Sequence, residues 1–457
     1  MIIKIYFTEE TDMANVISVI LIVLIVVMSL KNLTNGFCLF LMTRVLVPED
    51  VRFPIGNLSL NTAIILVLFF MTLINGFCNN EKIKYNRKFM LAVASFFVYA
   101  VFSLILSEYS NFEYQIGYVL QFFITDIMPG ILAICILKRK KDILTVVKVF
   151  LVTCIIVGIY GIFSYCIQSN PYRMLWSSVS STLTEKYWYG NYTTSTFTST
   201  NALGYFIGLS FPFVAFLLNK KIYKNYSQIA LVLLAIGAVL GKKRTTIVVL
   251  CCYFLMWFIS GNIKKRFKYL VFSIPIIIGF LVAIFTIPSL GSLKNMLITS
   301  IFFWDDSTYN AVTLGNGGST MALRVRQLMY PFTEIKDNII FGHGIGWCSW
   351  YLSRGVIHPM LFGFESLPSQ AICEFGIFSF IIYPLIFVGL YKFGDKKTKD
   401  KYVLLFVITS IIQMVATGQV YWYLELVMII LMRLVNEKQK FGGKKDATNY
   451  IDYNAGI

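Results

Sequence analysis

The stretch from Ser319 to Gly376 collects the side chains with which this chain could do chemistry. It contains Arg324 and Arg326, both histidines of the chain, and Glu365. Arginine binds phosphate through two parallel hydrogen bonds, and a partly buried carboxylate can accept a proton from an attacking hydroxyl. Two histidines without a cluster of carboxylates make a poor metal site, so we expect no metal. The residue types therefore favour phosphate binding and proton transfer.

The same stretch contains a glycine-rich turn around His343. Gly342, Gly344 and Gly346 suit a tight backbone turn, and no strand–turn–helix pattern surrounds them that would indicate nucleotide binding. Trp347 follows directly, and an aromatic face packs well on a sugar ring. The alternative is that the tryptophans form an aromatic belt at a membrane interface. His343 and Trp347 are therefore candidate substrate-binding residues.

The composition indicates a membrane protein. Of the 457 residues 57% are hydrophobic and 14% are charged, against about 25% charged residues in an average protein. The net charge of +17 comes mostly from short clusters between apolar blocks, which is the pattern of cytoplasmic loops rather than of a nucleic-acid-binding surface. The nine cysteines show no metal or redox spacing.

The apolar blocks predict an all-α polytopic membrane protein that forms a single domain over residues 1–457. A spanning helix needs about 20 apolar residues. We expect about twelve spans, and we assign the short apolar piece Phe37–Leu46 to the membrane interface rather than to a span. The predicted spans are 13–30, 57–77, 88–107, 114–137, 143–167, 201–218, 227–241, 245–260, 268–289, 367–391, 402–419 and 421–434.

The basic clusters predict the orientation. With these spans the clusters at 82–88, 138–141, 220–224, 264–268 and 392–401 fall on one side, which is then cytoplasmic together with both termini. The loop at 291–365, just before the last three spans, carries balanced charge and is expected outside. Lys242, Lys243 and Arg244 break the rule, because they fall at the outer end of two short spans. Either a span is misplaced, or the three cations face an anionic ligand.

Three segments resemble the O-antigen polymerase/ligase superfamily of membrane glycosyltransferases. Thr196–Gly204 is similar to the family's "G-x-F-x-N-x-N-x-L-A" segment, with Asn201 at the second Asn, and Gly241–Thr246 is similar to its "S-R-(small)" helix start, with Arg244 at the Arg. Arg324 precedes the Gly342–Gly346 turn by the family's interval. Where ligases of the family carry "H-N-x-x-L", this chain has Glu365-Ser366-Leu367, which looks more like the polymerase branch.

The resemblance implies a role for each candidate residue. Arg244 and Arg324 would hold the diphosphate of a lipid-linked donor, assisted by Arg326 and Lys243, while Glu365 would take the proton of the acceptor hydroxyl. Asn201, His343 and Trp347 would contact substrate. The alternatives are a solvated loop charge for Arg324, a snorkelling interfacial side chain for Arg244, and a helix-dipole partner for Glu365.

The expected function is metal-independent polymerisation of polyprenyl-diphosphate-linked oligosaccharides, without a cofactor, at the outer face of a bacterial cytoplasmic membrane. The resemblance places capsule or exopolysaccharide synthesis first, with a flippase and a chain-length regulator of the same pathway as partners besides membrane lipid. A ligase is the first alternative, although this chain lacks the histidine of the ligases' "H-N-x-x-L" segment. A flippase for lipid-linked sugar is the second, although such transporters usually show internal repeats and short loops.

Overall fold

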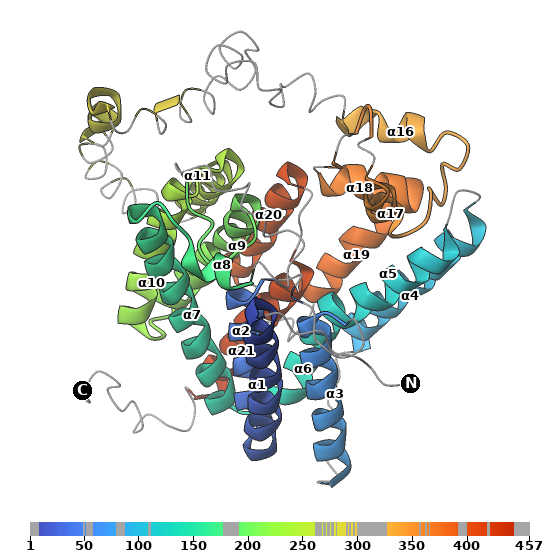
Figure 1. Cartoon of the computed structure of the whole chain (residues 1–457), viewed down its shortest axis with the longest axis horizontal. Coiled ribbons are helices and arrows are strands. Elements are labelled where there is room, and N and C mark those ends of the chain that lie inside the picture. The colour runs from blue at the N-terminus through green and yellow to red at the C-terminus, as the bar shows by residue number, and fades with distance from the viewer. Residues whose placement is uncertain are drawn as a thin grey trace.

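The computed structural model describes residues 9–48, 51, 58–78, 87–107, 111–176, 192–260, 281–288, 327–355, 358–361, 363–364, 366–391, 400–417 and 421–442, with further single residues and pairs between 267 and 298. These residues form a bundle of apolar helices (Figure 1). Five helical stretches are long and apolar enough to cross a membrane, which confirms the all-α membrane class. They lie in α1 (Glu9–Lys31), α3 (Leu60–Cys78), residues 112–136, α7 (Lys140–Cys166) and α9 (Thr200–Asn219). The twelve spans and the long outer loop stay predictions.

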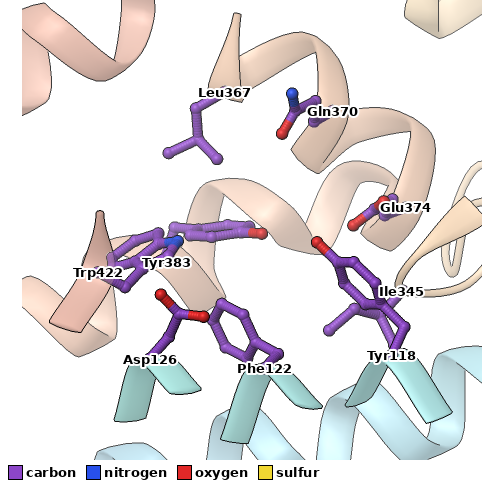
Figure 2. A pocket seen from close by; sticks show the side chains of 9 residues that line it. All are labelled: Tyr118, Phe122, Asp126, Ile345, Leu367, Gln370, Glu374, Tyr383 and Trp422. Carbon is purple, nitrogen blue, oxygen red and sulfur yellow. The ribbon is translucent and has the colours of Figure 1, made fainter. Parts of the chain in front are cut away.

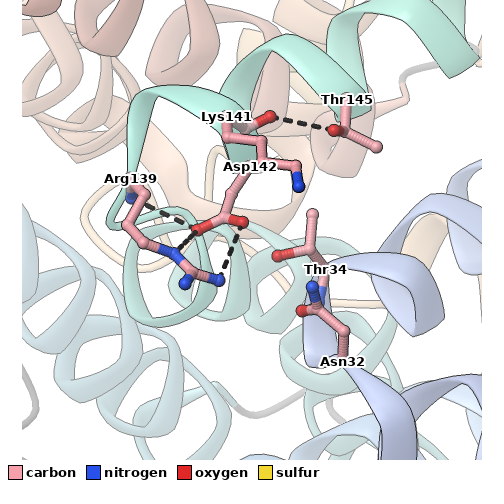
Figure 3. Close-up of polar contacts among 6 residues, drawn as sticks. All are labelled: Asn32, Thr34, Arg139, Lys141, Asp142 and Thr145. Atoms are coloured by element: carbon pink, nitrogen blue, oxygen red, sulfur yellow. Dashed lines mark hydrogen bonds and ion pairs between the residues drawn. The ribbon is translucent and has the colours of Figure 1, made fainter.

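One end of the bundle, here called the inner end, gathers basic residues. The backbone N–H of Arg139 donates to the Asp142 carboxylate at 3.3 Å, and its guanidinium pairs with the same group at 3.0 Å, which fixes the start of α7 (Figure 3). Lys220, just after α9, pairs with Asp400 at 2.7 Å, and Asp400 caps α20 (Lys401–Ala416). Lys148, near the start of α7, lies 5.9 Å from the centre of the ring of Tyr226, which closely follows Lys224, so the predicted cytoplasmic clusters 138–141 and 220–224 lie at one end of the bundle.

The opposite end, here called the outer end, joins the start of α9 to the turn between α10 (Lys224–Leu240) and α11 (Arg244–Ile259). Ser199 caps α9 by accepting the N–H of Ala202 at 3.1 Å. The N–H of Thr193 donates to the last carbonyl of α10, that of Leu240, at 3.1 Å. Three of the predicted spans thus meet at their outer ends as expected.

The segment Phe37–Leu46, which we expected at the membrane interface, lies instead in a buried helix. α2 (Leu33–Leu46) packs against α1, α3 and α7, and Phe37 and Phe40 are fully buried. It starts beside the first turn of α7 and ends near α8 (Pro171–Trp176), where the Tyr172 hydroxyl hydrogen-bonds to the Leu46 carbonyl. α2 therefore runs through the bundle parallel to α7, and Figure 3 shows the starts of the two helices side by side.

This extra helix changes the expected topology. α1 joins α2 through Asn32 alone and packs along it, so the two helices are antiparallel and α1 starts at the outer end. α21 (Trp422–Gly442) runs parallel to α6 (Met128–Ile136), because Tyr423 contacts Asp126 while Gly130, one turn later, approaches Leu426 and Ile430. α21 therefore ends at the inner end. The start of α1 and the end of α21 therefore lie at opposite ends of the bundle, and the side of the membrane on which each terminus lies stays a prediction.

The predicted span at 367–391 is also broken. α18 (Leu367–Phe375) ends at Gly376, whose φ of +62° suits glycine, and a Cβ there would collide with the carbonyl oxygen of Ile339. A single 3-10 turn (Gly376–Phe378) then leads into α19 (Ser379–Tyr391). α18 therefore stays at the outer end with α16 (Pro331–Glu334) and α17 (Trp347–Ser353), beside α4 (Arg87–Leu106) and α5 (Phe112–Phe122) (Figure 1).

Candidate active site

The first part of the site is the cationic turn Gly241–Arg244. Lys242 has a left-handed backbone with φ of +51°, and its ammonium lies 5.8 Å from the centre of the Tyr165 ring. Partial burial lowers the pKa of Lys242. Lys243 and Arg244 are half-buried at the start of α11. The positive end of a helix dipole disfavours cations and attracts anions, so this arrangement suits an anionic ligand.

The start of α9 packs directly against this turn. A Cβ added to Gly204 would lie 3.5 Å from Cβ of Lys243 and would collide with the Thr246 hydroxyl. Asn201 is exposed one turn before Gly204 on the same helix face. Two of the three segments that carry the family resemblance, Thr196–Gly204 and Gly241–Thr246, are therefore side by side at the outer end.

The third segment contains the predicted glycine turn, and the structure confirms it. Gly342, Gly344 and Gly346 have φ of +63°, +85° and +81°. A Cβ on Gly342 would lie 2.5 Å from the Cys373 carbonyl oxygen, and one on Gly346 would lie 2.8 Å from the ring of Tyr118. The side-chain amide of Gln115 donates to the carbonyls at 343 and 344 at 3.2 and 3.0 Å. The glycines thus let the turn dock closely on α5 and α18.

The docked turn encloses Glu374, the one acidic residue of α18. Its side chain is buried, and it accepts the backbone N–H groups of Gly346 and Cys348, the latter at 3.3 Å. Burial raises the pKa of Glu374 to about 7, because the hydrogen bonds offset only part of the cost of desolvating the carboxylate. A carboxyl group with this pKa exchanges its proton near neutral pH, as acid–base chemistry requires.

Glu374 lines a cavity of about 120 Å³ between the docked turn and the bundle. Figure 2 shows the hydroxyls of Tyr118 and Tyr383 and the carboxylate of Glu374 facing a common space, with Gln370 on one side and Asp126 opposite. The remaining lining residues are the apolar or aromatic side chains Phe122, Ile345, Leu367 and Trp422. The cavity is large enough for a few water molecules rather than for a sugar ring.

Asp126 reaches the cavity from a π-helical turn, Phe123–Ile127, between α5 and α6. Such turns interrupt the α-helical ladder and are frequent at functional sites. The Thr125 hydroxyl donates to the Asp126 carboxylate at 2.7 Å, the backbone N–H of Tyr423 also donates to it, and the buried Arg44 interacts with it electrostatically. Arg44 also lies 4.3 Å from the centre of the Tyr423 ring. Arg44 is therefore the cationic partner of Asp126 inside the bundle.

The first turn of α21 links the cavity to the start of α9. Trp422 lines the cavity and stacks on Tyr383, with ring centres 5.6 Å apart. The neighbouring Tyr421 lies 5.3 Å from the ring of Tyr205 in α9, and the Tyr205 hydroxyl donates to the fully buried Glu425 at 2.6 Å. The cationic turn and the cavity are therefore joined through packed aromatic and polar side chains.

The sequence-predicted residues distribute unevenly over this site. Asn201, Lys243 and Arg244 lie together as described above, whereas Arg324, Arg326 and Glu365 lie outside the described residues. His343 and Trp347 are buried, with ring centres 4.4 Å apart, so in this structure they support the glycine turn and do not face solvent. Burial lowers the pKa of His343 to about 4, which keeps the ring neutral at pH 7.

The sequence reasoning missed Glu374 and Asp126 as site residues. Each is a lone acid in an otherwise apolar or uncharged stretch, and that was the one signal in the sequence that could have indicated them. The described residues contain no group of three or more His, Cys, Asp or Glu side chains placed to hold a metal ion.

Comparison with known proteins does not identify the chain: no protein-family model matches it, and no curated protein matches it.

Proposed function

We propose that this protein is a membrane glycosyltransferase that polymerises polyprenyl-diphosphate-linked repeat units at the outer face of the cytoplasmic membrane. The observation that supports it is the pairing of two features at one end of the bundle: a turn of three cations at the start of α11, and a buried carboxyl group with a pKa near 7. The first suits a diphosphate leaving group and the second suits proton transfer.

In the proposed reaction a hydroxyl oxygen of the acceptor repeat attacks the anomeric carbon of the donor. The bond from that carbon to the hydroxyl oxygen forms, and the bond to the diphosphate oxygen breaks. The lipid diphosphate leaves with the bonding electrons, and its charge is stabilised by Lys243, Arg244 and the sequence-predicted Arg324. The hydroxyl proton passes to a carboxylate. Atoms and charge balance without a further reactant.

Two carboxylates compete for the role of base. Glu365 is the candidate from the sequence, and Glu374 is the candidate from the structure. The cavity beside Glu374 is too small for a sugar, so Glu374 would receive the proton through an intervening water, which general-base catalysis permits. Separate Glu365→Gln and Glu374→Gln variants distinguish the two, since loss of the base should lower turnover by roughly 10²- to 10⁴-fold.

The decisive experiment supplies purified protein in sealed lipid vesicles with one lipid-linked repeat unit and no nucleotide. A ladder of longer lipid-linked glycans is the expected product. Movement of the substrate across a vesicle membrane without elongation would instead indicate a flippase, and a single transfer to an added acceptor would indicate a ligase.

A matched pair of variants tests the cationic turn. Arg244→Lys keeps the charge but loses the planar fork that binds two phosphate oxygens, whereas Arg244→Gln loses the charge as well. We expect strongly reduced elongation in both. Full activity of Arg244→Lys would show that the site needs charge alone, and full activity of Arg244→Gln would remove Arg244 from the site.

A further inference from the structure

Part of the docked outer region exposes large apolar side chains that no membrane span accounts for. Met329 is 64% exposed, Phe332 41%, Ile339 48% and Ile340 51%. These four residues, here called the loop patch, lie in and around α16, beside the last two turns of α4 and the start of α19. Exposed apolar residues gathered in this way mark a surface that contacts another apolar phase.

The loop patch continues the lipid-facing surface of two apolar helices. The ring of Phe332 stacks on that of Phe380 in α19, with centres 6.4 Å apart and planes at 7°. The N–H of Ile377 donates to the Ile339 carbonyl at 2.8 Å, and the Tyr99 hydroxyl of α4 donates to the Ile340 carbonyl at 2.8 Å.

Beside these contacts both helices expose further large apolar side chains. On α19 they are Phe380, Ile381, Leu385 and Val388, and on α4 they are Val98, Phe102, Ile105 and Leu106. The apolar surface therefore runs from the helices onto the loop without a polar boundary at the contacts described.

The opposite face of α16 is built differently. Pro331 and Ile335 are buried, and the Glu334 carboxylate turns toward the ring nitrogen Nε2 of His358 at 3.4 Å. Nδ1 of His358 accepts the N–H groups of residues 360 and 361 at 3.2 and 2.9 Å, so the ring proton resides on Nε2 and is donated toward Glu334. This polar contact fixes the inward face of α16 and so directs its apolar residues away from the site.

We propose that the loop patch is inserted into the acyl-chain boundary of the bilayer, so that the segment from 329 to 340 lies in the membrane interface. Continuity with α4 and α19 favours lipid over a protein partner. The exposed Lys336 and Asp337 between the apolar residues suit the headgroup layer, where lysine interacts with lipid phosphates. The inference rests on the exposure and the contacts above and does not depend on the proposed catalytic function.

Spin-label accessibility in phospholipid vesicles tests the insertion. Single cysteines at 329 and 340 carry the label, in the full-length chain with Cys78, Cys166 and Cys251 replaced by serine. Ile381→Cys on α19 supplies the lipid reference, Lys336→Cys the headgroup reference, and the labelled background protein the baseline. Molecular oxygen concentrates in the acyl region, whereas a water-soluble nickel chelate is excluded from it.

We expect labels at 329 and 340 to resemble position 381, with oxygen more accessible than the nickel chelate. The reverse order at both positions would show a water-exposed surface and overturn the inference. Low access to both reagents would show a covering protein, such as a second copy of the chain, and would overturn it as well. Both positions are exposed, and monodisperse elution of each labelled protein confirms that it is folded.

Discussion

Replacing Glu374 by glutamine should change how the stability of the protein depends on pH. In the folded protein burial raises the pKa of Glu374 to about 7, against an ordinary value of 4.5. Because one pH unit is worth about 1.4 kcal/mol, this difference corresponds to on the order of 3 kcal/mol in the free energy of unfolding. The Glu374 side chain is buried, so solvent screening does not reduce this figure appreciably.

The sign follows from proton binding. Between pH 4.5 and 7 the folded protein holds a proton on Glu374 that the unfolded chain releases, so this contribution to stability is full below 4.5 and is lost as the pH rises through 7. His343 acts in the opposite direction. Its folded pKa of about 4 lies below the ordinary 6.5, so its contribution is present above 6.5 and is lost on acidification. The two slopes oppose each other in the wild type.

Comparing variants isolates Glu374, because the His343 contribution is common to both proteins. Denaturant unfolding in one detergent from pH 5 to 8, followed by tryptophan fluorescence, gives each free energy. Between pH 5 and pH 8 the free energy of unfolding of Glu374→Gln should rise by about 3 kcal/mol relative to that of the wild type. Gln370→Ala perturbs the same cavity without a titrating group, so its offset should stay constant with pH. Parallel curves for the wild type and Glu374→Gln would refute the raised pKa.

Three further predictions rest on the packing. Gly342→Ala adds a Cβ that collides with a carbonyl oxygen and should lower the free energy of unfolding by at least about 2 kcal/mol. The control Gly355→Ala, which has a positive φ but open space around its Cβ, should lower it by about 1 kcal/mol, and thermal unfolding measures both. Tyr205→Phe leaves the buried Glu425 without its hydroxyl donor and should lower the free energy of unfolding by about 1–3 kcal/mol in the same assay. An unchanged thermal unfolding midpoint would contradict this hydrogen bond. Epitopes placed before α1 and after α21 should be accessible from opposite faces of the membrane, and access from one face would contradict the path of α2.

The long apolar helices were predictable from sequence because one property determines them. The span expected at 143–167 is α7 (Lys140–Cys166), and that expected at 201–218 is α9 (Thr200–Asn219). Each combines a continuous apolar stretch with a basic residue or a cap at its end. The glycine turn at 342–346 was predictable for a similar local reason, since three glycines at alternate positions have few other uses.

α2 was not predictable because tertiary packing determines it. Its 14 residues are too few for the length rule, and they include Thr34, Thr43 and Arg44. All three are buried by neighbouring helices, and Arg44 lies over Tyr423 from the far end of the chain. A window along the sequence cannot detect a helix whose surroundings come from α1, α3, α7 and α21.

The site residues divide along the same line. Arg244 and Asn201 stand out locally, because one is a cation at an unexpected boundary and the other starts a helix. Glu374 acquires its properties only when the glycine turn, held by Gln115, covers it from 30 residues away in sequence. Asp126 likewise reaches the cavity only through its π-helical turn. Local sequence patterns therefore indicated Arg244 and Asn201, whereas Glu374 and Asp126 became recognisable as site residues only in the folded structure.

The two helices that meet at the cationic turn are shorter than the hydrocarbon core of a bilayer. α10 has 17 residues and α11 has 16, which at about 1.5 Å per residue gives roughly 24–26 Å, against a hydrocarbon core of about 30 Å. Both expose apolar ridges, with Val232 and Leu255 each 60% exposed. Hydrophobic mismatch of this kind thins the surrounding bilayer. If α10 and α11 cross the bilayer as predicted, this thinning brings lipid phosphates toward Lys242, Lys243 and Arg244. Membranes of shorter acyl chains should then bring anionic headgroups to the turn at the lowest cost in deformation.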